Sequence, residues 1–280
     1  MRDSIIHVFR NTPFGRSSLL QSAYFAELMK VRLEVYIPNE RQFIMYFQHS
    51  VVTVNLSKGY LRDKDTAEEH VKEVLRNMGA DYSFFHAKPC AATGLPEIPT
   101  DIRFFAAPRC LMEHPRKAGL GHLGPRVRNI IRNAMFPIFI PALAFRPWKQ
   151  VTVLFGGSGR SLNAVRLAEE IRQVTELPLS VFTHSKDDDR ESYAELLQKA
   201  GLEHLADERG ANWIFRKDKT FEDALWHLPD DALLVASAFG GSPIKERLLG
   251  TRMEQMQNEM PNPMLIIGPF SRAFTVGSPA

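Results

Sequence analysis

The chain has 280 residues, of which 44% are hydrophobic and 24% charged, a composition typical of a folded globular protein with one or two domains. No apolar run approaches the roughly 20 residues that a membrane-spanning helix needs, and the first residues lack the pattern of a signal peptide. The two cysteines, Cys90 and Cys110, fit a reducing compartment. We therefore expect a cytoplasmic protein that is not bound to membranes.

The net charge of +3 is divided unevenly along the chain. Residues 1–148 hold 20 basic and 13 acidic residues, a net charge of +7, whereas residues 149–280 hold 15 and 19, a net charge of −4. Two halves of opposite sign would attract each other across a shared interface. Binding to nucleic acid is not expected, because aromatic residues are not interleaved with the basic ones.

Strand and helix patterns alternate through the first half. Apolar, β-rich residues predict a strand at 4–10, and residues 11–15 predict a turn. Ser17 or Ser18 could cap a helix that runs to about Lys30. The later pattern predicts strands or extended segments at 33–37, 43–47, 51–56, 82–86, 102–107 and 138–140, a helix at 66–78, and a helical face at 127–134.

The second half repeats this alternation. A strand at 150–155 is followed by the glycine-rich turn 156–159, a helix at 161–174 and a strand at 177–183. The remaining pattern predicts helices at 191–200, 221–227 and 244–260, and strands at 213–216, 232–237 and 264–267.

This order indicates two copies of one unit of about 140 residues. Residues 20–27 match the pattern of residues 162–169, an offset of 142 residues, the difference between 162 and 20. Near the end of each copy a glycine, Gly124 or Gly250, stands thirteen residues before a proline. The chain therefore contains a tandem repeat.

We predict two domains, residues 1–147 and 148–280, joined by a linker at 142–150. Alternating strands and helices predict an α/β fold, in which each domain has a mostly parallel sheet with helices on both faces.

The loop after the strand at 232–237 has a spacing that is typical of one nucleotide-binding family. Universal stress proteins that bind ATP carry a glycine, two residues, a glycine, nine residues, and then Gly-Ser or Gly-Thr. Here Ser237, Gly240, Gly250 and Thr251 stand at these positions, with serine in place of the first glycine. The second half resembles that family, since a loop that leads into a helix N-terminus presents free N–H groups to a phosphate.

The resemblance implies two flavodoxin-like, Rossmann-like (HUP-type) universal stress protein domains that pair through their last strands, 138–140 and 264–267. It implies a stress-linked regulatory protein that forms a dimer or other homo-oligomer and binds ATP or a related adenine nucleotide, with Mg²⁺, rather than turning it over. The residues expected to bind nucleotide are Gly156, Gly157, Ser158, Phe182, Ser237, Phe239, Gly240, Gly241, Ser242, Gly250 and Thr251.

The sequence departs from the family pattern in two ways. An acidic residue follows the first strand in members that bind ATP, but Gly156 stands there in the second copy and Arg10 in the first. The first copy also lacks the glycine spacing, and basic residues crowd its end. They could hold an anion by charge, or form a face that meets solvent or the acidic second copy. These residues are Arg109, Arg116, Lys117, Arg126, Arg128 and Arg132.

Other chemistries have less support in the sequence. No P-loop spacing occurs, and residues 155–161 resemble the pyrophosphatase loop without its leading serine and aspartate. Cys110, His114 and His122 are too loosely spaced to predict a metal site, and no catalytic residue can be assigned. Two alternatives stay open: a universal stress protein that acts only through protein–protein interaction, and an adenine-nucleotide hydrolase.

Overall fold

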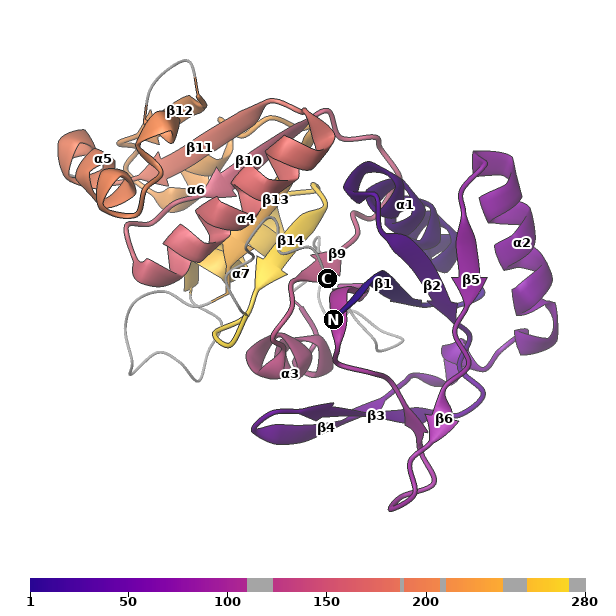
Figure 1. Ribbon diagram of the computed structural model, residues 1–280. Helices are drawn as coiled ribbons and strands as arrows, with labels where there is room; N and C mark the ends of the chain where they lie inside the picture. The colour runs from indigo at the N-terminus through magenta and orange to yellow at the C-terminus, as the bar shows by residue number, and fades with distance from the viewer. Residues whose placement is uncertain (110–122, 187–188, 207–209, 239–250, 272–280) are drawn as a thin grey trace.

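The computed structural model describes residues 1–109, 123–186, 189–206, 210–238 and 251–271 (Figure 1). A ten-stranded sheet runs through both halves in the order β12-β11-β10-β13-β14-β9-β8-β1-β2-β5. No helix in these ranges is long and apolar enough to cross a membrane.

Each half contributes five strands, all parallel within that half. The first half supplies β1 (Arg2–Val8), β2 (Arg32–Tyr36), β5 (Tyr82–Phe84), β8 (Ile102–Ala106) and β9 (Ile138–Ile140). The second half supplies β10 (Gln150–Leu154), β11 (Leu179–His184), β12 (Asn212–Arg216), β13 (Ala232–Ser237) and β14 (Met264–Ile267). The fold class predicted from the sequence is confirmed, with the first strand of each half in the middle of its five.

The two halves meet at an antiparallel pair of strands, β9 and β14. Phe139 lies opposite Leu265, with Ile138 opposite Ile266 and Ile140 opposite Met264. These are the last strands of the two copies, which the resemblance names as the pairing elements. A twofold pseudosymmetry axis therefore passes between them, and the strands of one half run opposite to those of the other.

The repeat is most regular in the first strand and helix of each copy. Helix α1 (Pro13–Met29) and helix α4 (Gly159–Thr175) have 17 residues each, begin after the caps Thr12 and Ser158, and end in a left-handed residue. The offset between the copies is therefore 146 residues, the difference between 159 and 13. The sequence alignment at 142 residues was wrong by four, because an apolar helix face nearly repeats after one turn.

Helix α1 also begins earlier than predicted. The Thr12 side chain accepts a hydrogen bond from the Gly15 backbone N–H at 3.1 Å. Pro13 follows at the first helical position, where a proline loses no hydrogen bond that the helix needs. Residues 13–15 are therefore helical rather than part of a turn.

Two buried layers cover the two faces of the sheet. One face packs against α1, α2 (Ala67–Met78), α4 and α5 (Arg190–Lys199). The other face packs against α3 (Pro125–Asn133), α6 (Phe221–Leu225) and α7 (Thr251–Glu259). The apolar run of β13 is unbroken because both faces of the strand are buried. Leu233 and Val235 lie in the first layer, and Leu234 and Ala236 lie in the second.

A small second sheet belongs to the first half alone. Its order is β4-β3-β7-β6, built from β3 (Gln42–Phe47), β4 (Ser50–Asn55), β6 (Lys88–Pro89) and β7 (Pro96–Glu97). The hairpin buries Phe43, Met45 and Val54 in the layer that holds α3. In the first half this sheet and α3 share the face that two helices cover in the second half (Figure 1). Two short 3-10 helices, Lys58–Tyr60 and Lys64–Thr66, follow the β3–β4 hairpin along the chain.

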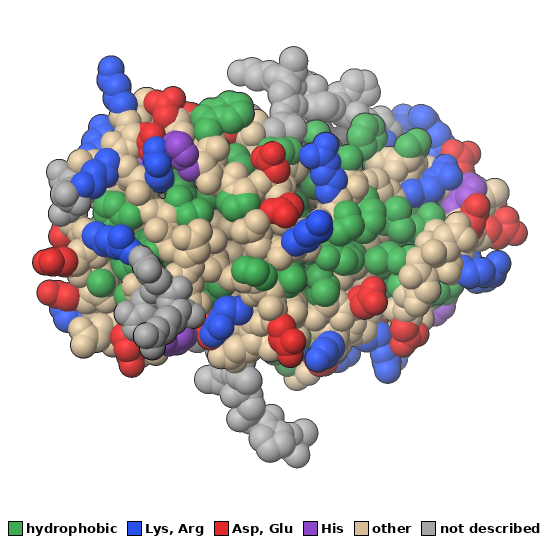
Figure 2. Space-filling view, turned by 90° about the horizontal axis from the view of Figure 1, so that it is seen from above, with side chains coloured by type: hydrophobic (Ala, Val, Ile, Leu, Met, Phe, Trp, Pro, Cys, Tyr) green, Lys and Arg blue, Asp and Glu red, His purple; other side chains and the backbone are tan. Residues whose placement is uncertain are grey.

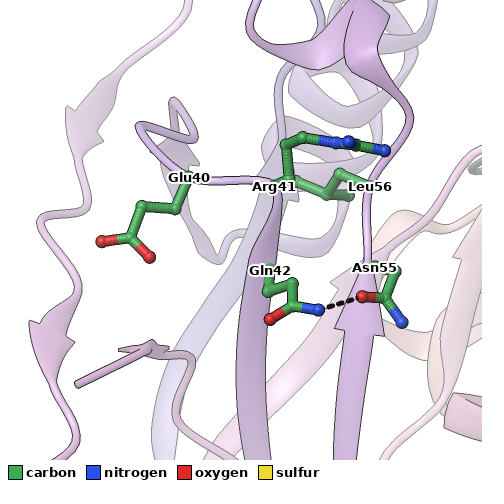
Figure 3. Close-up of a pocket in the computed structure, with 5 residues that line it drawn as sticks. All are labelled: Glu40, Arg41, Gln42, Asn55 and Leu56. Atoms are coloured by element: carbon green, nitrogen blue, oxygen red, sulfur yellow. Dashed lines mark hydrogen bonds between the residues drawn. The ribbon is translucent and has the colours of Figure 1, made fainter. Parts of the chain in front are cut away.

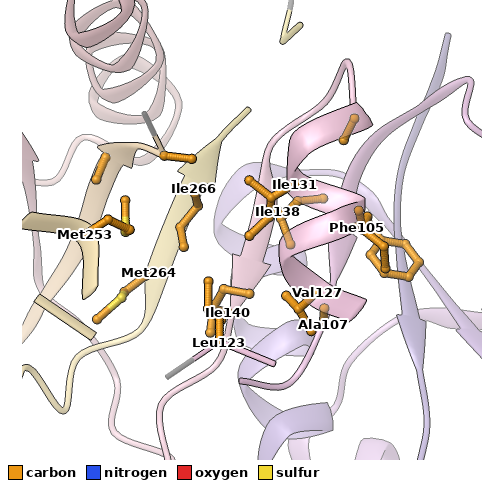
Figure 4. Close-up of a cluster of buried hydrophobic side chains, with 14 of the residues drawn as sticks. Phe105, Ala107, Leu123, Val127, Ile131, Ile138, Ile140, Met253, Met264 and Ile266 are labelled. Carbon is orange, nitrogen blue, oxygen red and sulfur yellow. The ribbon is translucent and has the colours of Figure 1, made fainter. Parts of the chain in front are cut away.

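One hydrophobic cluster is continuous across the junction. Figure 4 shows Val127 and Ile131 of the first half on one side of β9 and Met264 and Ile266 of the second half on the other. On the opposite face, Phe139 stacks on Phe25 with ring centroids 4.7 Å apart. The two halves therefore share their core.

The backbone of Gly268 closes the same junction. A Cβ atom at this position would lie 2.0 Å from the carbonyl oxygen of Ile131 and 3.3 Å from that of Ala134. The end of β14 therefore lies against the end of α3 at a distance that only glycine permits.

Candidate functional site

The strand order identifies one crevice in the second half where a ligand would bind. Strand β10 pairs with β11 on one side and with β13 on the other, all in parallel. After β10 the chain forms β11 and β12 on one side of that strand, and it then returns to form β13 and β14 on the other side. The strand order therefore reverses at β10. Open α/β sheets bind ligands at the carboxyl ends of the strands at such a point. The loop after β10 and the residues after Ser237 therefore share one edge of the sheet.

The loop after β10 is held by its own hydrogen bonds. Ser158 Oγ accepts from the backbone N–H of Ser161 at 3.1 Å, and the N–H of Ser158 donates to Ser161 Oγ at 2.9 Å. This reciprocal cap fixes the first turn of α4. Gly157 has φ of 73°, and a Cβ atom there would lie 3.0 Å from the Tyr193 ring. Gly156 has open space beside it, so a side chain would fit at this position.

Phe182 lies inside the core rather than on an open wall. It is 1% exposed and packs edge-on against Phe221, with ring centroids 6.3 Å apart. His184, two residues further along β11, is 5% exposed and lies 2.9 Å through Nε2 from the carbonyl oxygen of Asp218. Both side chains shape the layer beneath the crevice.

On the β13 side of this position, the structure describes the chain up to Ala238 and again from Thr251. Ser237 closes β13 beside Ile267, and the backbone of Thr251 begins α7. The other predicted nucleotide-binding residues, Phe239, Gly240, Gly241, Ser242 and Gly250, lie outside the described residues. The structure thus brings Gly156, Gly157, Ser158 and Ser237 to neighbouring strand ends, above the buried Phe182.

The equivalent position in the first half holds an arginine. The Phe9 N–H donates to the Tyr36 carbonyl as that of Phe155 does to Phe182, so Arg10 stands where Gly156 stands. The Arg10 guanidinium lies 5.6 Å from the centre of the Tyr60 ring. A Cβ atom on Gly59 would lie only 2.4 Å from one of its nitrogens. The arginine side chain therefore packs against Tyr60 and Gly59 in the first half, whereas open space lies beside Gly156 in the second.

The neighbouring residue, Asn11, is engaged within the first half. Its side-chain nitrogen donates to the carbonyl oxygen of Asp63 at 2.9 Å and to Thr66 Oγ1 at 3.1 Å. Its side-chain oxygen lies 3.0 Å from His70 Nδ1. These contacts tie the loop after β1 to α2, so the two copies use this loop differently.

Arg109 is one of the basic residues near the end of the first copy, and it contacts the second half. It is 6% exposed and reaches the second half, where it donates to the carbonyl oxygens of Gln257, Met260 and Asn262 at 2.6, 2.9 and 3.2 Å. Burial lowers the pKa of Arg109 to about 10, so it stays charged at neutral pH. The prediction that this basic face meets the second copy holds for Arg109, but the partners are backbone carbonyls rather than acidic side chains.

Opposite charges of the two halves meet in the ion pair between Arg103 and Glu170. Arg103 of β8 pairs with Glu170 of α4, and the same guanidinium lies 2.8 Å from Asp3. On the face seen in Figure 2, basic and acidic side chains are interspersed over both halves. The excess charge of each half is therefore not gathered into one patch on that face.

A pocket of about 470 Å³ lies where the β3–β4 hairpin joins the first half. It is lined by Glu40, Arg41, Gln42, Asn55 and Leu56. Gln42 and Asn55 are hydrogen-bonded to each other across the two strands, while Glu40 points away from them (Figure 3). No sequence pattern predicted this pocket, which lies in the first half, whereas the predicted nucleotide-binding residues lie in the second.

One buried contact in the second half was not expected from the sequence. Asn262, between two prolines, is 2% exposed and donates through Nδ2 to the carbonyl oxygens of Pro229, Asp230 and Ala232. It fixes the end of α7 to the start of β13, and the Pro-Asn-Pro sequence was its only signal. Within the described ranges no three His, Cys, Asp or Glu side chains gather as metal ligands would.

The chain matches no protein-family model and no curated protein. Its fold, however, matches solved universal stress proteins over nearly the whole chain. A universal stress protein from Archaeoglobus fulgidus DSM 4304 is 11% identical, with a TM-score of 0.62, covering 96% of this chain and 99% of that one. A putative universal stress protein from Pseudomonas aeruginosa UCBPP-PA14 is 15% identical, with a TM-score of 0.57 and coverages of 96% and 94%.

The chain therefore has the fold of the tandem universal stress proteins. The same fold also occurs in the cytoplasmic domain of a prokaryotic cation chloride cotransporter, which is 10% identical, with a TM-score of 0.53 and coverage of 98% of both chains. At these identities the likeness establishes the architecture, and function has to be argued from the site.

Proposed function

We propose that this chain is a tandem universal stress protein of the cytoplasm that binds ATP or a related adenine nucleotide, with Mg²⁺, in its second half. It acts by binding the nucleotide rather than by turning it over. The observation that carries the proposal is the reversal of strand order between β10 and β13. There Gly156 and Ser237 stand at or just after the ends of adjacent parallel strands, and the glycine spacing predicts a phosphate-binding loop between Ser237 and Thr251.

The two halves differ in what they offer to such a ligand. In the second half, open space lies beside Gly156, and the sequence before Thr251 of α7 carries the glycine spacing. In the first half, Arg10 packs over Tyr60 and Gly59 at the equivalent place. A nucleotide phosphate favours free backbone N–H groups before a helix. We therefore assign the ligand to the second half alone.

A thermal-shift titration with ATP and Mg²⁺ tests the proposal. A ligand that binds only the folded state stabilises it by about 2.7 kcal/mol at a hundred times its dissociation constant, so millimolar ATP should raise the melting temperature. Gly240→Val should abolish the shift, provided that the unliganded variant melts as the unaltered protein does. An unchanged titration in Gly240→Val would move the site elsewhere.

A gain-of-function variant makes a sharper test. Gly156→Asp restores the acidic residue that ATP-binding members carry at this position, and the open space there accommodates it. A hydrogen bond to a charged group contributes about 1.5 kcal/mol, so we expect ATP affinity to rise about tenfold, as measured by isothermal titration calorimetry.

The matched control is Gly159→Asp, which adds the same charge in the first turn of α4, also in open space. It should leave the affinity unchanged or weaken it, because a carboxylate repels a triphosphate. Equal affinities in Gly156→Asp and the unaltered protein would argue against a nucleoside contact at residue 156.

Two other functions remain as outcomes of the same titration. The absence of any shift at millimolar ATP would favour a universal stress protein that acts through protein–protein interaction, for which the packing of Arg10 against Tyr60 and Gly59 is the supporting observation. A shift accompanied by release of phosphate would favour an adenine-nucleotide hydrolase.

A further inference from the structure

The outer side of helix α1 carries an apolar ridge that reaches the molecular surface. Leu20, Tyr24 and Leu28 recur at four-residue intervals, so they follow one another along one side of the helix. All three side chains are partly exposed, whereas Ala23 and Phe25 face the core. On the face seen in Figure 2, hydrophobic side chains gather mainly over the first half. The ridge is therefore a surface feature of that half.

The linker between the two halves widens this ridge. Gln21 and the backbone of Ala142 are joined by two hydrogen bonds, of 2.7 and 3.0 Å, which hold the linker beside α1. The ring of Phe145 then lies edge-on to that of Tyr24, with centroids 5.8 Å apart. Leu143, in the same segment, is 45% exposed. Helix and linker together present one apolar surface.

The second half has no such ridge on its equivalent helix, α4. At the offset of 146 residues, Arg166 stands in place of Leu20, and Glu170 stands in place of Tyr24. Both charged side chains are used within the chain, Arg166 in a hydrogen bond to a backbone carbonyl and Glu170 in the ion pair with Arg103. Each chain therefore carries the ridge once, on α1.

Two charged residues lie on one flank of the ridge. Arg16 and Glu27 are eleven residues apart, the difference between 27 and 16, which is close to three helical turns. They therefore point to the same flank of α1, about 16 Å apart along the helix axis. This distance is too long for an ion pair between them. Among the described residues, neither side chain forms an ion pair with another part of the chain.

A second copy of the chain complements this pattern. When two α1 helices pack antiparallel about a twofold axis, residues with the same midpoint face each other, and a flank meets its own copy. The midpoint is 21.5 for Arg16 and Glu27, and 22 for Leu20 and Tyr24. One arrangement therefore places Arg16 of each copy opposite Glu27 of the other and packs the two ridges together.

The strands that could otherwise join two copies are already paired inside the chain. Strands β9 and β14 pair with each other, and each has a parallel neighbour, β8 or β13, on its other side. Neither leaves an edge for a second chain. On the face seen in Figure 2, charges of both signs are interspersed, which suits a copy of the same surface better than an anionic membrane.

We propose that two copies of this chain form a dimer in which α1 packs antiparallel against α1, with ion pairs between Arg16 and Glu27 at both ends of the contact. Because each chain carries the ridge once, the contact closes a pair and does not propagate into a filament. This inference is independent of nucleotide binding.

Sedimentation velocity of the full chain tests the contact, at concentrations from about 1 to 100 μM, where small interfaces associate. Leu20→Arg gives α1 the residue that α4 carries at the equivalent position. It should raise the dissociation constant of the dimer about tenfold or more, because each ridge then receives a charge that has no partner. The control is Trp226→Arg, at a 77% exposed residue at the end of α6 on the other face of the sheet. It should stay within about twofold.

Charge reversal tests the orientation of the two helices. Glu27→Arg sets two arginines against each other at both ends of the contact, so we expect the dissociation constant to rise about tenfold. Adding Arg16→Glu restores opposite charges and should return it to within about threefold of the unaltered protein. Since residues 16 and 27 are too far apart to pair within one helix, such a recovery arises only between two chains.

Several results would overturn the proposal. These are a protein that stays monomeric at about 100 μM, a dimer that Leu20→Arg and Glu27→Arg leave intact, and a dimer that Trp226→Arg weakens as much as Leu20→Arg. A loss in Glu27→Arg that Arg16→Glu does not recover would exclude the antiparallel arrangement. Circular dichroism confirms that each variant is folded, and the charge-reversal pair serves as the test if Leu20→Arg is not. All measurements are made without nucleotide, so their outcome is separate from that of the ATP titration.

Discussion

Replacing Phe139 with alanine is expected to lower the free energy of unfolding by about 3–5 kcal/mol, because it leaves a large cavity in a fully buried region. Phe139 is 0% exposed, occupies the middle of β9 and stacks on Phe25 of α1. It stands opposite Leu265 of the other half, so the cavity opens at the junction. Both halves should therefore lose stability together, in one transition.

Urea denaturation followed by circular dichroism and by tryptophan fluorescence measures this effect. The control is Phe14→Ala, since Phe14 is 72% exposed and its loss should change stability by no more than about 0.5 kcal/mol. Two separate transitions, with the second half unfolding as in the unaltered protein, would show that the continuous sheet does not make the halves cooperative.

The second large effect is a loss of stability in acid that originates at His7. This residue is 2% exposed in β1 and hydrogen-bonded through Nδ1 to Ser22 Oγ at 2.8 Å. Burial lowers its pKa from 6.5 to about 3. Between these two pH values, His7 is protonated in the unfolded chain and neutral in the folded protein. Stability therefore falls as the pH drops below 6.5, by roughly 3 kcal/mol between pH 7 and about pH 4.

The second half supplies the matched control for this prediction. At the offset of 146 residues, Val153 and Ala168 occupy the places of His7 and Ser22, and both are 0% exposed. The double variant His7→Val with Ser22→Ala should be less sensitive to pH by about that amount, in urea titrations at pH 7 and pH 4. Equal acid sensitivity in the two proteins would assign the effect to carboxylates instead.

Strands buried on both faces were the elements best predicted from the sequence. The predicted limits of 138–140, 232–237 and 264–267 agree with β9, β13 and β14. Strands β9 and β14 are short apolar runs bounded by proline or glycine, and β13 is apolar from Ala232 to Ala236, because burial on both faces of a strand favours apolar residues. The start of α1 was predicted wrongly, because Thr12 and Pro13 begin the helix before the apolar pattern begins.

The candidate site was predictable only in part. The loops at Gly156 and after Ser237 follow from glycine spacing and strand order, because topology places the ends of adjacent parallel strands together. The roles of Arg10 and Arg109 could not be foreseen. Each depends on a partner distant in sequence, Tyr60 or the end of α7, and an arginine alone does not indicate whether it meets solvent, an anion or a carbonyl.

The pseudosymmetry axis between β9 and β14 allows a comparison with a dimer of two identical single-domain chains. Two identical chains related by such an axis would carry every side chain twice, so any change made for one purpose would appear on both sides. Here a single polypeptide passes through both halves, and Arg10 stands where its twin has Gly156, as Arg109 does where its twin has Ala238. Joining the copies into one chain lets the two halves carry different residues at equivalent positions, always in a one-to-one ratio.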